Sequence, residues 1–276
     1  MIRTTAFILF LFIFSFLNND AHDNYPVGAK SSAMGNVSVM MDDVWSAHNN
    51  QGATAFYDEF AIGIHHETRY LVYDMGYQAS VLTVPFKYGV MGLNFTLFGD
   101  KNFNDKKFGL SYSKKLFERL ALGVQIDVIN SYIQEYGKEN NICAEIGLFA
   151  EPIDNFTIGA HVFNPFQSNY EYLPTSLYGD INISTVYKLG MGYHFEEKLR
   201  LAVEAEKDLY NKPVYRAGIN YHALYGLYVR IGGALNPNMY TFGLGYVYKR
   251  MFADFAFMSN AYLGFTPHFS LCYEIH

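Results

Sequence analysis

The residues best suited to metal chemistry are nine histidines and two cysteines. His65 and His66 are adjacent, and neighbouring side chains of a strand point to opposite faces, so these two cannot share one ion. The sequence contains no His-Glu-x-x-His and no paired cysteine spacing. For Cys143 and Cys272 we expect two buried thiols, with a disulfide between them as the alternative. These observations predict neither a metal site nor a bound cofactor.

The nearest approach to a nucleophile motif is Gly109–Ser113, which reads Gly-Leu-Ser-Tyr-Ser. It lacks the second glycine of Gly-x-Ser-x-Gly, and its alternating pattern indicates a strand rather than a strand-to-helix turn. No glycine-rich loop precedes a recognisable helix, so the sequence offers no phosphate-binding motif. We therefore expect a protein that is not an enzyme. The alternative is a Ser-His lipid hydrolase of the outer membrane.

The composition restricts the class of protein that must position these residues. Half of the 276 residues are hydrophobic, 18% are aromatic and 17% are charged, whereas a soluble domain carries about 25% charged residues. Such a chain is too apolar for a disordered protein. The net charge of −6 gives no support to nucleic-acid binding, which needs a clustered basic surface.

Most of the chain alternates with the period of a β-strand. In Leu120–Val128 every second residue is large and aliphatic, and the residues between are small or polar. Each such segment predicts a strand with one apolar face. Breakers such as Asn236-Pro237-Asn238 stand where turns are expected. Fourteen segments of this kind begin near Phe60, Tyr77, Val90, Phe108, Leu120, Ile142, Phe156, Ile183, Leu199, Tyr215, Leu227, Tyr240, Phe252 and Phe265.

Barrel geometry decides whether the apolar face of the strands points into the barrel or out of it. About eight strands form a barrel whose interior side chains can fill, whereas larger barrels enclose a lumen. A fourteen-stranded barrel with an apolar lumen would leave an unfilled hole. We therefore predict an all-β protein, a single closed antiparallel transmembrane β-barrel at 57–276, with apolar residues facing lipid. The alternatives are a soluble β-sandwich or two smaller barrels.

The two ends of the chain fit export to an outer membrane. Residues 1–21 carry one early positive charge and then a short apolar run, typical of a signal peptide. The alternative is an apolar N-terminal helix that stays attached. The last segment, from Phe265, alternates up to the terminus with aromatic residues on one face, which resembles the insertion signal of outer-membrane barrels. We expect a location in the outer membrane of a Gram-negative bacterium.

The predicted lumen face carries charged residues of both signs. We expect them to pair with one another and to stiffen the barrel, with a path for a polar ligand as the alternative. The residues are Asp127, Glu145, Lys188, Arg200, Glu204, Glu206, Arg216, Arg230 and Glu274.

The segment 22–56 differs from the rest because small and polar residues dominate it. It is too poor in large apolar residues for a lipid-facing strand, and we predict a plug packed inside the lumen, where glycine allows close backbone approach. An exposed N-terminal extension is the alternative. The residues that carry the pattern are Gly28, Met34, Gly35, Asp42, Asp43, Trp45, Asn49 and Gly52.

This pattern resembles the N-terminal signature of the PorV/PorQ branch of FadL-like outer-membrane proteins. That signature reads approximately Gly-Ala-Arg, Met-Gly, Asp-Asp and Asn-Pro-Ala-Gly, and here Asn50 and Gln51 replace its proline and alanine. Weaker similarity continues at Gly159–Pro165, Val203–Asp208 and Arg230–Gly232. The resemblance implies a fourteen-stranded barrel with an N-terminal plug.

The resemblance also implies a function. PorV-like proteins are associated with protein export, so we expect a non-catalytic accessory component that lies in outer-membrane lipid. It would bind another outer-membrane protein or a secretion-system component. The alternative is a FadL-like transporter of hydrophobic small molecules, which needs an apolar pocket between plug and wall and a lateral opening.

Overall fold

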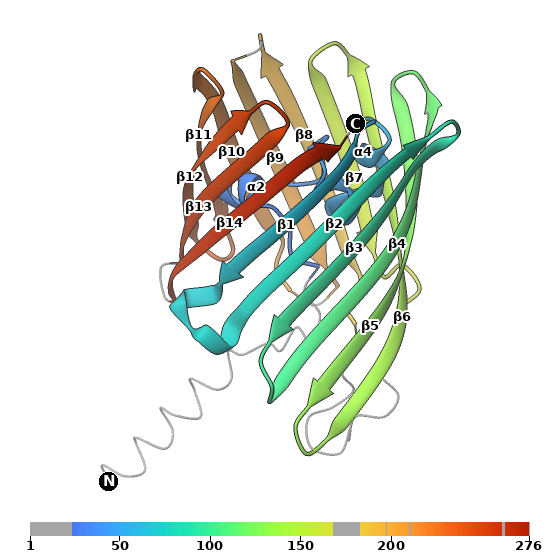
Figure 1. The fold of residues 1–276 in the computed structure, drawn as a ribbon, viewed down its shortest axis with the longest axis vertical. Helices are drawn as coiled ribbons and strands as arrows, with labels where there is room; N and C mark the ends of the chain where they lie inside the picture. The colour runs from blue at the N-terminus through green and yellow to red at the C-terminus, as the bar shows by residue number, and fades with distance from the viewer. Residues whose placement is uncertain (1–23, 168–182, 197, 210, 261–262, 276) are drawn as a thin grey trace.

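The computed structural model describes residues 24–167, 183–196, 198–209, 211–260 and 263–275. In this part of the chain, antiparallel strands form one closed barrel in which each strand pairs with its sequence neighbours and β1 pairs with β14 (Figure 1). The prediction of a closed all-β barrel of fourteen strands is confirmed. The strands are β1 (Phe60–Thr68), β2 (Gly76–Phe86), β3 (Gly89–Gly99), β4 (Phe103–Phe117), β5 (Leu120–Ile133), β6 (Gly137–Ile153), β7 (Phe156–Phe163), β8 (Val186–Phe195), β9 (Leu199–Asp208), β10 (Val214–Leu224), β11 (Leu227–Leu235), β12 (Met239–Tyr248), β13 (Met251–Asn260) and β14 (Gly264–Ile275).

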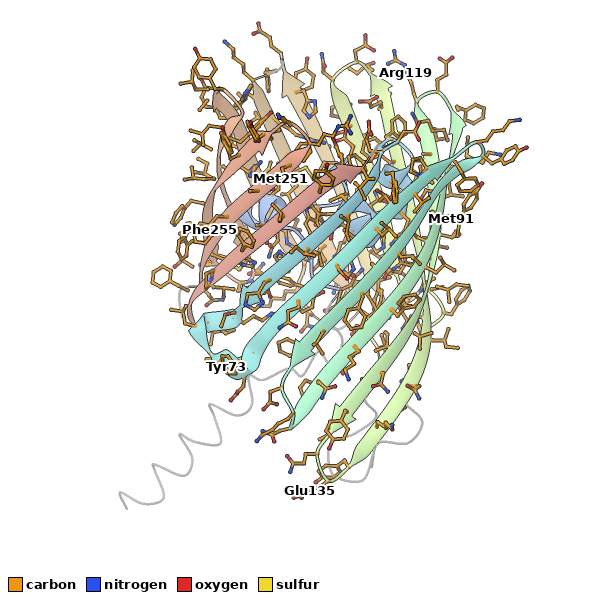
Figure 2. All side chains as sticks on the ribbon, viewed as in Figure 1. Tyr73, Met91, Arg119, Glu135, Met251 and Phe255 are labelled. Carbon is orange, nitrogen blue, oxygen red and sulfur yellow. The ribbon has the colours of Figure 1, made fainter. Side chains whose placement is uncertain are left out.

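The apolar face of the strands points outward. On β5, Val124 and Ile126 are 46% and 62% exposed, whereas Gln125 and Asp127 between and beside them are 1% and 0% exposed. Figure 2 shows the same arrangement for Phe255 of β13, whose ring lies on the outside of the wall. The outer surface is therefore apolar and the inner surface polar, the reverse of a soluble barrel.

Two strands are longer than the hydrophobic pattern predicts. β4 and β6 begin at Phe103 and Gly137, not near Phe108 and Ile142, and their extensions both pair with β5. The added residues are polar on both faces, as in Asn104–Lys107, so they carry no hydrophobic period. They extend the wall at its lower end in Figure 1.

The connections contain little regular structure. Two 3-10 turns, η1 (Arg69–Leu71) and η2 (Tyr73–Met75), join β1 to β2. The expected signal peptide and most of the predicted long connection at 164–179 lie outside the described residues. Among the described residues, no helix has the length and apolar character needed to cross a membrane.

The chain from Asn24 to Phe56 lies inside the barrel, and none of its residues is exposed. It contains three short helices, α2 (Ala29–Ala33), α3 (Ser46–Asn49) and α4 (Gln51–Thr54), drawn in blue in Figure 1. α2 contacts β12 and β13, and α4 contacts β5 and β6 on the opposite side. We call residues 24–56 the inner segment.

Candidate functional site

Trp45 packs both against the start of the inner segment and against the wall. Gly28 has φ of 103°, which favours glycine, and a Cβ atom there would lie 2.6 Å from Trp45. The indole also contacts the wall, since a Cβ at Gly63 of β1 would lie 2.9 Å from its ring. Asn49 binds both backbone groups of Val27, accepting from its N–H and donating to its carbonyl, each at 2.9 Å. The helices α2 and α3 are therefore tied together.

Met34 and Gly35 lie directly against the backbone of the wall. A Cβ atom at Gly218 of β10 would lie 2.8 Å from Met34 Cα, so only glycine allows this approach. Gly35 donates its N–H to Thr241 Oγ1 at 2.8 Å. A Cβ on Gly35 would lie 2.8 Å from the carbonyl oxygen of Ala217. The inner segment thus touches the backbone of β10 and β11 without intervening side chains, and it binds β12 through the Thr241 hydroxyl.

The neighbouring aspartates have different partners. Asp42 accepts a hydrogen bond at 2.9 Å from Arg200 of β9, whereas Asp43 accepts from Lys30 at 2.8 Å and from the Trp45 N–H at 3.1 Å. Burial alone would raise the pKa of the Asp42 carboxyl, but the charges of Arg200 and Lys30 outweigh it and hold that pKa below 3.8. Asp42 therefore binds the wall, and Asp43 fixes the inner segment internally.

The carboxylate of Glu204 on β9 binds the turn of the inner segment at Ser38 and Val39. It accepts the backbone N–H groups of Ser38 and Val39 at 2.7 and 2.9 Å and pairs with Arg216 at 3.1 Å. Arg216 also forms a bidentate pair with Glu206, at 2.8 and 3.0 Å. Charge-assisted hydrogen bonds of this kind are about twice as strong as neutral ones.

A second cluster surrounds Glu145 of β6. Its carboxylate accepts from Lys107 at 2.9 Å and from Gln51 of the inner segment at 2.7 Å, and lies 2.8 Å from His161 Nε2. Asp127 accepts from the side chain of Gln125 at 2.8 Å. Gln51 is the contact through which this cluster reaches α4.

Two other residues of the predicted charge network lie in separate pairs, since Arg230 donates to Asp254 at 2.6 Å and Glu274 accepts from Tyr57 at 2.9 Å. Lys188 instead joins the cluster of Arg216, because it lies 3.4 Å from Glu206, and it donates to the backbone carbonyl of Asn24 in the inner segment. The lumen therefore contains several local clusters. Those of Arg200, Glu204 and Glu145 bind the inner segment and do not link opposite sides of the barrel wall.

The two cysteines lie apart, whereas two of the histidines meet at one carboxylate. Cys143 and Cys272 are buried and form no disulfide with each other. His66 is on the outer face, as its adjacency to His65 requires, but His65 itself lies beside Glu67 and His268. The expectation of no metal-ligating group overlooked this cluster, because its third member comes from the far end of the chain. His65 and Glu67, two residues apart on one strand, were the available signal.

A pocket of about 620 Å³ lies in the wall formed by β8 to β12. Ala205, Ala217 and Gly233 leave space between larger outward-facing side chains, among them Tyr215 and Leu235. Ala217 and Gly233 pair with each other across β10 and β11. Gly35 of the inner segment lies on the lumen side of this same pair, so one layer of backbone separates the pocket from the inner segment.

Comparison with solved structures identifies proteins of similar fold. The barrel superposes on the CymD monoaromatic hydrocarbon channel with a TM-score of 0.69 and 12% identity, covering 92% of this chain and 99% of that chain. The Ralstonia pickettii toluene transporter TbuX gives 0.68 and 12%, covering 92% and 100%. A Pseudomonas aeruginosa FadL homologue gives 0.67 and 13%, covering 91% and 98%. No family model and no curated protein sequence matches the chain.

At these identities the similarity concerns the fold. The barrel has a fold similar to that of FadL-type channels, which agrees with the broader part of the resemblance seen in the sequence. Its assignment to the PorV/PorQ branch stays a prediction, as does the role of the inner segment as a plug.

Proposed function

We propose that this protein is an outer-membrane channel that binds hydrophobic small molecules. The observation that carries the proposal is the pocket in the wall at β8 to β12, whose volume of about 620 Å³ falls in the usual range for ligand sites. Its lining is mostly aliphatic and aromatic, which selects an apolar ligand. The fold it shares with hydrocarbon channels supports the same class of ligand.

The position of the pocket suggests how a ligand reaches the lumen. An apolar molecule dissolved in the membrane meets the outer face first, and the pocket is lined mainly by residues of that face. The lumen-facing Glu204, Arg216 and Met239 also line it. Because Glu204 binds the turn of the inner segment, ligand binding and the position of that segment are linked through one side chain.

The test is equilibrium binding to the full-length protein held in an amphipathic polymer, which avoids competition from detergent. Radiolabelled toluene and radiolabelled palmitate are measured in parallel. We expect saturable binding of one or both. Ala217→Trp fills the pocket and should weaken binding about tenfold, equivalent to about 1.4 kcal/mol of lost contact. Ala253→Trp places the same side chain on the outer face of β13 and should leave affinity unchanged.

An accessory role in protein export is the second candidate. The observation that favours it is the set of charged contacts that fix the inner segment to β6 and β9. A fixed segment suits a closed barrel that serves as a partner. Affinity capture from outer membranes in mild detergent separates the two: stoichiometric recovery of a large export barrel, together with no binding of either hydrophobic probe, would favour the accessory role.

A further inference from the structure

Three potential metal ligands meet where the first and last strands of the barrel join. His65 and Glu67 are two residues apart on β1, so both face the lumen. His268 lies on β14, directly opposite Glu67 in the strand register. All three side chains have no exposed surface. Residues from the two ends of the barrel sequence are thus brought to one point by closure of the sheet.

Their donor atoms converge. His268 Nδ1 and His65 Nε2 lie 2.9 and 3.6 Å from the same oxygen, Glu67 Oε2, and the three atoms lie within 4.8 Å of one another. In a tetrahedral zinc site with bonds of about 2.1 Å, ligand atoms lie about 3.4 Å apart. The spacing of the cluster therefore brackets that of a metal site.

The same atoms make no well-aligned hydrogen bonds. Among the described residues, the ring nitrogens of His65 and His268 and Glu67 Oε2 meet one another only in the ion-pair contacts of 2.9 and 3.6 Å, and none has a hydrogen-bond partner of good geometry. Buried polar atoms are almost always satisfied, and each exception calls for an explanation. An ion shared by the three donors satisfies one nitrogen of each histidine and the carboxylate oxygen together.

The surroundings orient the carboxylate. Arg69 Nε donates to Glu67 Oε1 at 2.7 Å, which leaves Oε2 directed at the two histidines. Carboxylates that bind metals are commonly held by such a second hydrogen bond. Trp45 packs edge-on against the His65 ring, with ring centroids 6.0 Å apart, and limits its rotation.

We propose that His65, Glu67 and His268 bind one divalent transition-metal ion, for which Zn²⁺ has the matching ligand preference. Two imidazoles and one carboxylate form a known set of three zinc ligands, in which water takes the fourth position. Since the side chains are fully buried, the ion serves as a structural cross-link between β1 and β14, beside Trp45 of the inner segment. This site is independent of the hydrophobic pocket, which lies in β8 to β12.

The test measures metal binding by the full-length protein, purified in detergent with a tag that contains no histidine and dialysed against EDTA. Titration with Co²⁺, followed by its visible d–d absorption, reports stoichiometry and coordination. We expect one equivalent of Co²⁺, displaced by Zn²⁺. His65→Gln and His268→Gln should each weaken binding by more than about 100-fold, beyond the loss from removing a supporting partner. His66→Gln, the adjacent residue on the outer face, should bind as the native protein does.

Folding of each variant is checked by its heat-dependent mobility in gel electrophoresis. If the variants do not fold, zinc X-ray absorption of the native protein decides, with two imidazole ligands expected. Three results would overturn the proposal: no stoichiometric binding by the native protein, unchanged binding in both folded cluster variants, or an absorption spectrum without imidazole. A charge pair of His268 with Glu67 would give the first of these.

Discussion

Single carboxylates of the wall determine how the inner segment is held. Glu204 accepts two backbone N–H groups while Arg216 balances its charge. Glu145 accepts from the side-chain amide of Gln51 while Lys107 balances its charge. Buried charges are tolerated because each is paired, and removing one partner leaves the other uncompensated. The inner segment is therefore held by directional polar contacts in addition to apolar packing against the wall, and the polar contacts fix one position more strictly than apolar packing does.

His48 of α3 should make the packing of the inner segment sensitive to acid. Burial, together with the positive charge of Lys107, lowers its pKa well below 6.5, against the opposing effect of Glu145. Below about pH 6.5 His48 is therefore protonated in the unfolded state but remains neutral in the folded state. The free energy of unfolding consequently falls as the pH drops below about 6.5. Trp45, the only tryptophan, reports this directly. The urea midpoint of its fluorescence red shift should be lower at about pH 5 than at about pH 7.5.

A glutamine at position 48 isolates this effect. Gln can donate to the Tyr25 carbonyl, as His48 Nε2 does at 3.2 Å, but it does not titrate. His48→Gln should therefore show a smaller pH dependence, whereas His66→Gln should keep the native one. An unchanged pH dependence in His48→Gln would contradict the assignment.

The residues that position the inner segment were only partly predictable. Glycines and the Asp42-Asp43 pair are visible in the sequence because small residues and charges stand out in an apolar chain. Their partners are not, since Gln51 meets Glu145 only because α4 lies against β6, and His65 meets His268 only through closure of the sheet. Alternation assigns a face to each residue, but pairing across the lumen depends on where the segment lies.

At the scale of elements, the wall and the inner segment are held by different forces. Each strand has two hydrogen-bonded neighbours around the closed ring, so the backbone pairing of the wall is complete without the inner segment. The inner segment has only short helices of four or five residues, which are marginal alone and depend on the wall. The barrel should consequently survive loss of the segment.

Deletion of residues 24–56 should open the lumen to water and ions. The polar wall residues that now bind the segment become hydrated, and the barrel of fourteen strands is wide enough for an aqueous channel. In planar lipid bilayers, the deletion variant should show discrete conductance steps that the intact chain lacks. A folded deletion variant without such steps would count against the segment as a plug.

Element type was the most predictable property, and element length the least. The period of two identifies every strand because each has one apolar face. It fails at the start of β4 and β6, where residues such as Asp105 and Lys138 extend the strands beyond the apolar region. There the hydrogen-bonded ladder to β5 continues without any hydrophobic signal.

At the scale of the whole molecule, the outer face shows what surrounds the barrel. Large apolar side chains are exposed on every strand except β7, where they are half-buried, and this apolar surface is far more extensive than the patches found on soluble monomers. A polar inner face and an apolar outer face are stable only when the outer face meets lipid. The cost of a charge on that face should therefore depend on its depth in the membrane.

Phe255 and Met251 of β13 test this dependence on one strand (Figure 2). Both face outward, Phe255 near the middle of the strand and Met251 at its first residue. In a lipid bilayer, Phe255→Arg should lower the free energy of unfolding by about 2–4 kcal/mol and Met251→Arg by about 0–1 kcal/mol. Urea unfolding in phosphatidylcholine vesicles measures both. Water around the barrel would remove the difference between the two positions, because an arginine is then equally well solvated at each, and equal losses would exclude a transmembrane orientation of β13.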